Sequence, residues 1–96
     1  MKIVSGWAFP DADEFMAAEM KPSGAYQASH LRVALGFVTD FRLAIDGGAH
    51  VGTWSRPMAA TFAHVIAVEP SPDTCEALRA NMATFGCDNV TVRHVA

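Results

Sequence analysis

The chain has 96 residues, 51% of them hydrophobic, and carries seven Lys and Arg against ten Asp and Glu, which gives a formal net charge of −3. This length and composition fit one small domain with a core of its own, and the lack of a basic cluster argues against nucleic-acid binding. The apolar runs are too short to span a membrane or to form a signal peptide, and Cys75 and Cys87 have no metal-ligand or redox spacing, so we expect a soluble cytoplasmic protein with reduced thiols and no metal site.

Residues 1–40 are predicted to form a helical lead-in to the domain. An apolar and aromatic stretch ends at Pro10, and its Trp7 and Phe9 are large enough to need a covering surface, so we expect both to pack against the flank of the domain. An acidic run at residues 11–14 then opens a short helical pattern that continues to Met20. Carboxylates suit the positive end of a helix dipole, so we interpret this run as a solvated helix start rather than a metal site.

A second helix is predicted over residues 25–39, after a turn at Pro22-Ser23-Gly24. Its apolar side chains recur at helical spacing in two adjacent stripes, which predicts a helix that packs on more than one neighbour. The first stripe consists of Tyr26, His30, Val33 and Phe37, and the second of Leu31, Leu35 and Val38. We interpret His30 as a packed or surface histidine and not as a catalytic base.

Residues 41–96 alternate between strand and helix patterns. Strands are predicted over residues 42–46, 65–68 and 90–95, and the continuous apolar run of the middle one indicates a strand buried on both faces. Strands and helices that alternate with short links predict an α/β fold. We expect a three-layer Rossmann-like fold with a parallel sheet. This chain would be half of such a domain and would supply its first three strands, which lie in the sheet in the order third, second, first.

Two helices are predicted between these strands. Pro57 restricts the first helix, because proline is tolerated only in a first turn. The helix either begins late, near Ser55, or begins at Gly52 with a bend or an irregular first turn at Pro57, and we favour the bend or irregular turn. The second has Ser71 as its expected N-cap, Pro72 at its first position and Gly86 as its end. Its residues Cys75, Leu78, Met82 and Phe85 follow at spacings that form one buried face.

The first strand runs into the segment Ala44-Ile45-Asp46-Gly47-Gly48-Ala49-His50-Val51-Gly52. A glycine loop between a strand and a helix lets a ligand approach the backbone, and the free N–H groups at the helix start are expected to point at that ligand. Read from Gly47, the spacing approximates the dinucleotide fingerprint with Ala49 in place of a glycine; read from Asp46, it fits a methyltransferase loop better. It is not a P-loop, because no lysine follows Gly52. A tight turn that binds nothing is the alternative.

Two carboxylates are expected at the edge of the sheet where the strands end. Asp46 ends the first strand and Glu69 the second, and in a parallel sheet both ends open onto the rim where ligands bind. A carboxylate placed like Glu69 is the usual partner of two ribose hydroxyls. The charge of Asp46 suits the ammonium and sulfonium groups of S-adenosylmethionine better than the anionic pyrophosphate of NAD.

Four blocks of the chain resemble FkbM-type methyltransferases, class I enzymes that use S-adenosylmethionine. The blocks are residues 44–55, 65–74, 78–81 and 88–92, which read AIDGGAHVGTWS, VIAVEPSPDT, LRAN and DNVTV in the order and at the spacing of the family. The resemblance implies that the methionine end of the cofactor is lined by Asp46, Gly48, Ala49, His50 and Gly52. It also implies that Glu69 holds the ribose hydroxyls and that Pro70 and Ser71 lie near the adenosine. Many members carry Asn at the position of His50, where the backbone would still serve.

The resemblance covers residues 44–96 and yields no catalytic residue, because the family's acceptor-selecting residues lie later in its sequence. None of His30, His50, His64 and His94 has a partner in the sequence that marks it as a base. We therefore expect the N-terminal half of a methyltransferase domain, a fragment or a truncated product, that acts on an oxygen of a sugar or another small molecule. Its first strand would have an open edge through which copies associate. The alternatives are an NAD(P)- or flavin-binding Rossmann half and a non-catalytic remnant that associates through that edge.

Overall fold

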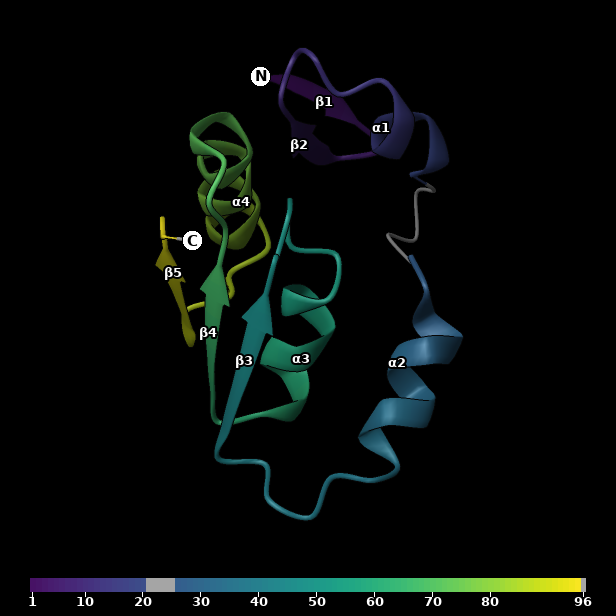
Figure 1. The fold of residues 1–96 in the computed structure, drawn as a ribbon, viewed down its shortest axis with the longest axis vertical. Coiled ribbons are helices and arrows are strands. Elements are labelled where there is room, and N and C mark those ends of the chain that lie inside the picture. Colours follow the sequence, from purple (N-terminus) through teal and green to yellow (C-terminus); the bar gives the residue numbers. More distant parts are fainter. Residues whose placement is uncertain (21–25, 96) are drawn as a thin grey trace.

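The computed structural model describes residues 1–20 and 26–95, so the turn predicted at residues 22–24 lies outside the described part of the chain. The elements are β1 (Lys2–Val4), β2 (Trp7–Phe9), α1 (Phe15–Glu19), α2 (Ala28–Leu35), β3 (Leu43–Gly47), α3 (Ser55–Thr61), β4 (His64–Val68), α4 (Pro72–Thr84) and β5 (Val90–Arg93). Figure 1 shows that the arrowheads of β3, β4 and β5 point toward the end of the molecule where β1, β2 and α1 lie. No helix in the described ranges is long and apolar enough to cross a lipid bilayer.

Parallel pairing joins β3 to β4 and β4 to β5, so the three strands lie side by side in chain order. The register sets Asp46 beside Ala67 and Val65 beside Val90, and residues paired in this way point to the same face of the sheet. Val65 and Ala67 are completely buried on that face. Val65 packs in a cluster with side chains of α2 and α3, and Ala67 in one with side chains of α4. The helices therefore cover this face and form the core there.

The opposite face of the sheet is open in the residues that the structure describes. Leu43 and Ile45 of β3 are 52% and 67% exposed, and Ile66 and Val68 of β4 are only half-buried. The predicted three-layer arrangement, with the middle strand buried on both faces, is wrong for these residues. The physical reason is the direction of the connections: crossovers of one hand that step across a sheet in one direction place their helices on the same face.

Residues 2–9 form an antiparallel hairpin of β1 and β2. Ser5 and Gly6 make its two-residue turn, with φ of 53° and 83°, which is the geometry that matches the twist of a hairpin. The predicted helical lead-in is therefore wrong over this stretch. Trp7 and Phe9 are 1% and 0% exposed and share a cluster with Ala77 of α4, so the prediction that they pack on the flank of the domain is confirmed.

Asn81 of α4 fastens this hairpin to the rest of the fold. Its side chain is 1% exposed, and its Oδ1 accepts the N–H of Ala8 at 2.7 Å. Its Nδ2 donates to the carbonyl oxygens of Ala8 at 3.0 Å and Val51 at 2.9 Å. Because Val51 belongs to the loop after β3, one buried amide holds together the hairpin, the glycine loop and α4.

The helix α2 is shorter and more exposed than predicted. It ends at Leu35, and the second of its predicted stripes packs against α3 and β4, with Leu31 buried and Leu35 and Val38 half-buried. In the first stripe, Val33 and Phe37 are 66% and 84% exposed. The prediction that α2 packs on more than one neighbour is therefore confirmed for the second stripe, and it is wrong for Val33 and Phe37 of the first.

The helices α3 and α4 show how the predicted helix ends fold. Turns at residues 51–54 precede α3, which begins at Ser55 and has Pro57 in its first turn, where a missing N–H is tolerated. The helix therefore begins late, and the favoured bend or irregular first turn is wrong. Ser71 occupies the N-cap position of α4, but its side chain makes no capping hydrogen bond. Gly86, with φ of 66°, closes α4 with the hydrogen bonds of a Schellman motif, as its position predicts.

Candidate functional site

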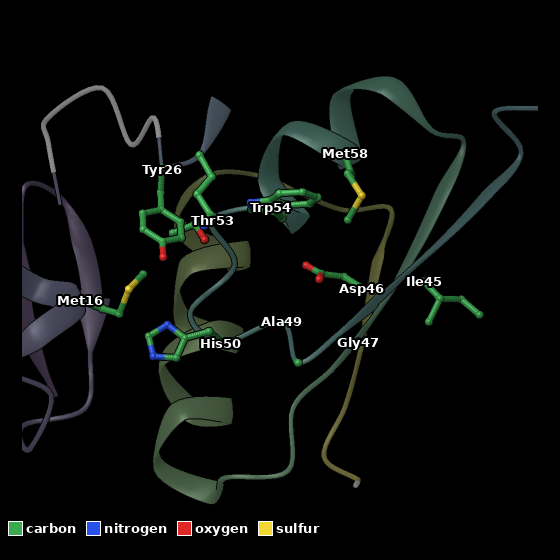
Figure 2. A pocket seen from close by; sticks show the side chains of 12 residues that line it. Met16, Tyr26, Ile45, Asp46, Gly47, Ala49, His50, Thr53, Trp54 and Met58 are labelled. Atoms are coloured by element: carbon green, nitrogen blue, oxygen red, sulfur yellow. The ribbon is translucent and has the colours of Figure 1, made fainter. Parts of the chain in front are cut away.

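A cavity of about 550 Å³ opens where β3 ends, a volume within the range of pockets that hold small-molecule ligands. One wall comes from the end of β3 and the glycine loop, a second from the turn before α3, and a third from the N-terminal segments. The lining residues are Met16, Tyr26, Gln27, Ile45, Asp46, Gly47, Gly48, Ala49, His50, Thr53, Trp54 and Met58. In Figure 2 the Asp46 carboxylate points toward Trp54, whereas the Ile45 side chain points away from the other lining residues.

The glycines of the loop have two different roles. A Cβ built on Gly47 or Gly48 would meet nothing within 4 Å, so the loop surface beside β3 is open to a ligand. Gly52, with φ of 101°, instead faces α4, where a Cβ would lie 2.5 Å from the Met82 Cε and 3.0 Å from the Leu78 Cδ1. Gly52 therefore allows the loop to approach α4 closely, and it does not line the cavity.

The backbone donors of the loop are already in use. The N–H groups of Gly48 and Ala49 both donate to the carbonyl oxygen of Val68, at 2.9 and 2.8 Å. The N–H of His50 donates to the Glu69 Oε1 at 2.9 Å. These three N–H groups therefore bind the end of β4 and do not point into the cavity; the prediction concerned the N–H groups at the start of the next helix. An anionic group in the cavity would not find the three loop N–H groups free.

Asp46 places a partly buried carboxylate in the cavity wall. The Ser55 hydroxyl donates to its Oδ2 at 2.6 Å, and Ser55 itself is completely buried. Burial raises the pKa of Asp46 above its usual value, the Ser55 hydrogen bond opposes that shift, and the nearby charge of Glu69 adds to it. A positively charged ligand group in this cavity would offset the cost of keeping the Asp46 charge.

Glu69 lies behind the loop and not in the cavity wall. It is 7% exposed, and while its Oε1 accepts the His50 N–H, its Oε2 accepts the N–H of Ser71 at 3.0 Å. Ser71 lines a second depression, of about 430 Å³, which Asp13 and Met16 border from the other side. Of the eight predicted cofactor residues, the cavity wall contains Asp46, Gly48, Ala49 and His50 and lacks Gly52, Glu69, Pro70 and Ser71. The ribose and adenosine assignments stay predictions.

Asp13 is a site residue that the sequence reasoning missed. It is not a solvated side chain, because only 11% of it is exposed. Its Oδ1 accepts the N–H groups of Met16 at 3.0 Å and Ala17 at 3.3 Å, and its Oδ2 lies 3.2 Å from the Nε2 of His50. An Asp before a helix signals a cap, but no local pattern reveals a partner so far away in the chain. Met16, Tyr26 and Gln27 were missed for the same reason.

Two of the other three histidines have structural partners. The Nε2 of His64 lies 2.7 Å from the Thr91 hydroxyl, and the Nε2 of His94 lies 3.0 Å from the Pro70 carbonyl oxygen. His30 is exposed on α2. Within residues 1–20 and 26–95, no three His, Cys, Asp or Glu side chains come together in a way that would hold a metal ion.

No protein-family model matches the chain, and no curated protein sequence matches it. Solved structures of methyltransferases do. A SAM-dependent methyltransferase from Aquifex aeolicus matches with a TM-score of 0.67 and 15% identity over 82% of this chain and 44% of that one. The precorrin-6y C5,15-methyltransferase of Geobacter metallireducens GS-15 matches with a TM-score of 0.63 and 20% identity over 79% and 42%.

A third structure is phosphoethanolamine N-methyltransferase 1 of Haemonchus contortus in complex with phosphoethanolamine and S-adenosylhomocysteine, with a TM-score of 0.57 and 18% identity over 72% and 15%. The chain spans less than half the length of each of these three proteins. At such low identity the similarity establishes the fold. The described chain has the Rossmann-like α/β fold of these methyltransferases.

Proposed function

We propose that the chain is the cofactor-binding half of an S-adenosylmethionine-dependent methyltransferase of the FkbM type, which methylates an oxygen of a sugar or another small acceptor. The observation that carries the proposal is the Asp46 carboxylate in the wall of a cavity whose loop N–H groups, at residues 48–50, are already bonded. This arrangement suits an ammonium or sulfonium group. A pyrophosphate would meet a negative charge there and would not find the N–H groups of residues 48–50 free, which argues against the NAD and flavin alternative.

The residues present fit such a cofactor. Asp46 would hold its positively charged end, the bare backbone at Gly47 and Gly48 leaves room for close approach, and Trp54 and Thr53 close the far side. When bound, S-adenosylmethionine supplies an electrophilic methyl group. The contribution of this chain is to bind and orient the cofactor, which is where most of the catalytic gain of such a transfer arises. The two free cysteines are compatible with a reducing cytoplasm.

Calorimetric titration of the 96-residue chain, after circular dichroism shows that it is folded, tests the proposal. S-adenosylhomocysteine should bind and NAD should give no heat. The variant Asp46→Asn should bind S-adenosylhomocysteine more weakly, whereas Asp88→Asn, an exposed carboxylate outside the cavity wall, should bind it like the parent chain. Binding of NAD without binding of S-adenosylhomocysteine would overturn the proposal.

The ribose role of Glu69 needs a sharper test than its removal, because both carboxylate oxygens also hold backbone N–H groups. We propose comparing S-adenosylhomocysteine with its 2′-deoxy analogue. A hydrogen bond to a charged group contributes about 1.5–3 kcal/mol, so the parent chain should prefer the full ligand by about 10- to 150-fold. Glu69→Gln should reduce that preference, and Glu76→Gln on the exposed side of α4 should not. Equal affinity of the parent chain for both ligands would contradict the assignment.

We also propose that copies of the chain associate through the outer edge of β3. Within the described residues this edge is unpaired, and the exposed Leu43 and Ile45 lie beside it. An unpaired edge strand without a lysine or proline is open to pairing. Light scattering should detect a dimer, and Ile45→Lys should return it to a monomer that keeps the circular-dichroism spectrum of the parent chain. A monomer at high concentration would refute this association.

A further inference from the structure

The glycine loop contains one side chain in an unfavourable backbone conformation, that of His50. Its φ is 54°, in the left-handed region that residues other than glycine seldom adopt. Such a conformation persists only where surrounding contacts hold it. Two contacts do so here: the His50 N–H donates to the Glu69 Oε1 at 2.9 Å, and the ring Nε2 lies 3.2 Å from the Asp13 Oδ2.

Asp13 is itself held in place. Its Oδ1 accepts two backbone N–H groups of α1, so the carboxylate has little freedom to turn away from His50. The other ring nitrogen of His50, Nδ1, is buried and has no hydrogen-bond partner among the described residues. Among the described residues, Asp13 is therefore the group whose close contact orients the His50 ring.

These contacts form a continuous path from the N-terminal segment to the start of α4. It runs from the first turn of α1 through Asp13 to the ring of His50, from the His50 N–H to Glu69, and from Glu69 to the N–H of Ser71. We infer that Asp13 is a positioning residue, which holds the glycine loop in its ligand-binding form through His50 and so makes cofactor affinity depend on the N-terminal segment. The inference rests on the proposed function of the cavity.

Asn at position 13 separates the two roles of the carboxylate. Asn caps helices about as well as Asp, so Asp13→Asn keeps the start of α1 and removes the charge that faces His50. Asp13→Ala removes both. Glu14→Gln is the matched control, because it removes a charge from the exposed neighbouring residue.

The experiment measures the affinity of the full chain for S-adenosylhomocysteine in Asp13→Asn, His50→Asn and the double variant. Contacting residues in one network typically couple by about 0.5–3 kcal/mol, so each single variant should bind about 2- to 150-fold more weakly. The double variant should bind no more weakly than either single one, because Asp13 acts through His50. The control should bind like the parent chain. Unchanged affinity in Asp13→Asn, or effects that multiply in the double variant, would overturn the inference.

A second measurement keeps the inference separate from the proposed function. Hydrogen exchange of the His50 amide, measured without ligand, should speed up in Asp13→Asn and stay unchanged in Glu14→Gln. If the parent chain bound no S-adenosylhomocysteine, the proposed function would fail, and faster exchange would still support the Asp13 contact. Unchanged exchange in Asp13→Asn would refute that contact on its own. A role confined to capping α1 predicts that Asp13→Ala lowers the melting temperature and that Asp13→Asn changes neither exchange nor binding.

Discussion

Replacing Asp46 with Asn should make the ligand-free protein more stable and its cofactor binding weaker. Burial raises the pKa of Asp46, so the ionised carboxylate is less favourable in the folded chain than in the unfolded one. The unfolded chain then loses its Asp46 proton at a lower pH than the folded chain. The free energy of unfolding therefore falls as pH rises from the usual value near 3.8 through the raised pKa, and above that pKa the full cost remains.

Asn has nearly the same shape as Asp, and its side-chain oxygen still accepts the Ser55 hydroxyl that now lies 2.6 Å from Oδ2. The variant should thus unfold at higher urea concentration than the parent chain at pH 7, and the difference should shrink as pH falls toward 4. Binding should change in the opposite direction. Loss of a hydrogen bond to a charged group costs about 1.5–3 kcal/mol, or about 10- to 150-fold in the affinity for S-adenosylhomocysteine.

Urea unfolding at pH 4 and pH 7 and calorimetry at pH 7 measure both effects. Asp88→Asn serves as the control, because its exposed carboxylate should change neither quantity. Two results would refute the reasoning. A less stable Asp46→Asn at pH 7 would mean that the carboxylate stabilises the ligand-free fold, and unchanged affinity would mean that no positive ligand group lies beside it.

Two further predictions concern the packing behind the loop. Gly52→Ala should lower the free energy of unfolding, measured in urea, by about 1–3 kcal/mol, because its Cβ would collide with Met82 and its φ of 101° is unfavourable for alanine. Gly47→Ala is the control and should lower it far less, because its Cβ meets nothing within 4 Å. Equal costs for the two would contradict the close approach of the loop to α4. Asn81→Ala should lower the free energy of unfolding by about 2–4 kcal/mol, because it leaves the buried backbone groups of Ala8 and Val51 without partners. Arg79→Ala, exposed on the same helix, is the control. A loss as small as that of the control would contradict the three hydrogen bonds of Asn81.

The parts of the fold that the sequence predicted are those fixed by neighbours in the chain. The apolar run of β4, the glycine loop and the Gly86 helix end are local patterns, and each lies where it was expected. The hairpin of residues 2–9 also had a local signal, the Ser5-Gly6 pair between two apolar runs, which the lead-in prediction passed over. Missing that signal left the N-terminal segment without a place in the fold.

The contacts that complete the candidate site had no such signal. Asp13 lies against His50, and Asn81 is hydrogen-bonded to Ala8, across distant parts of the chain. Polar contacts of this kind leave no periodic pattern in a sequence. The hydrogen bonds of Glu69 to the loop backbone could not be predicted for a related reason. Its place at the end of β4 was predictable, but whether its oxygens face a ligand or the backbone of the loop depends on how the loop turns at His50.

Two long-range contacts, those of Asn81 and of Asp13, indicate which parts of the chain form the candidate site. Asn81 bonds the hairpin and the glycine loop with one amide, and Asp13 ties the first turn of α1 to His50 in the same loop. These contacts place residues from the first 20 against residues 50 and 51, so the N-terminal segment contacts the glycine loop directly and through Asn81. A division at residue 40 follows the change in sequence pattern, but it cuts through the contacts that shape the cavity. The N-terminal segment therefore contributes residues to the candidate site, because Met16, Tyr26 and Gln27 line the cavity and Asp13 contacts His50.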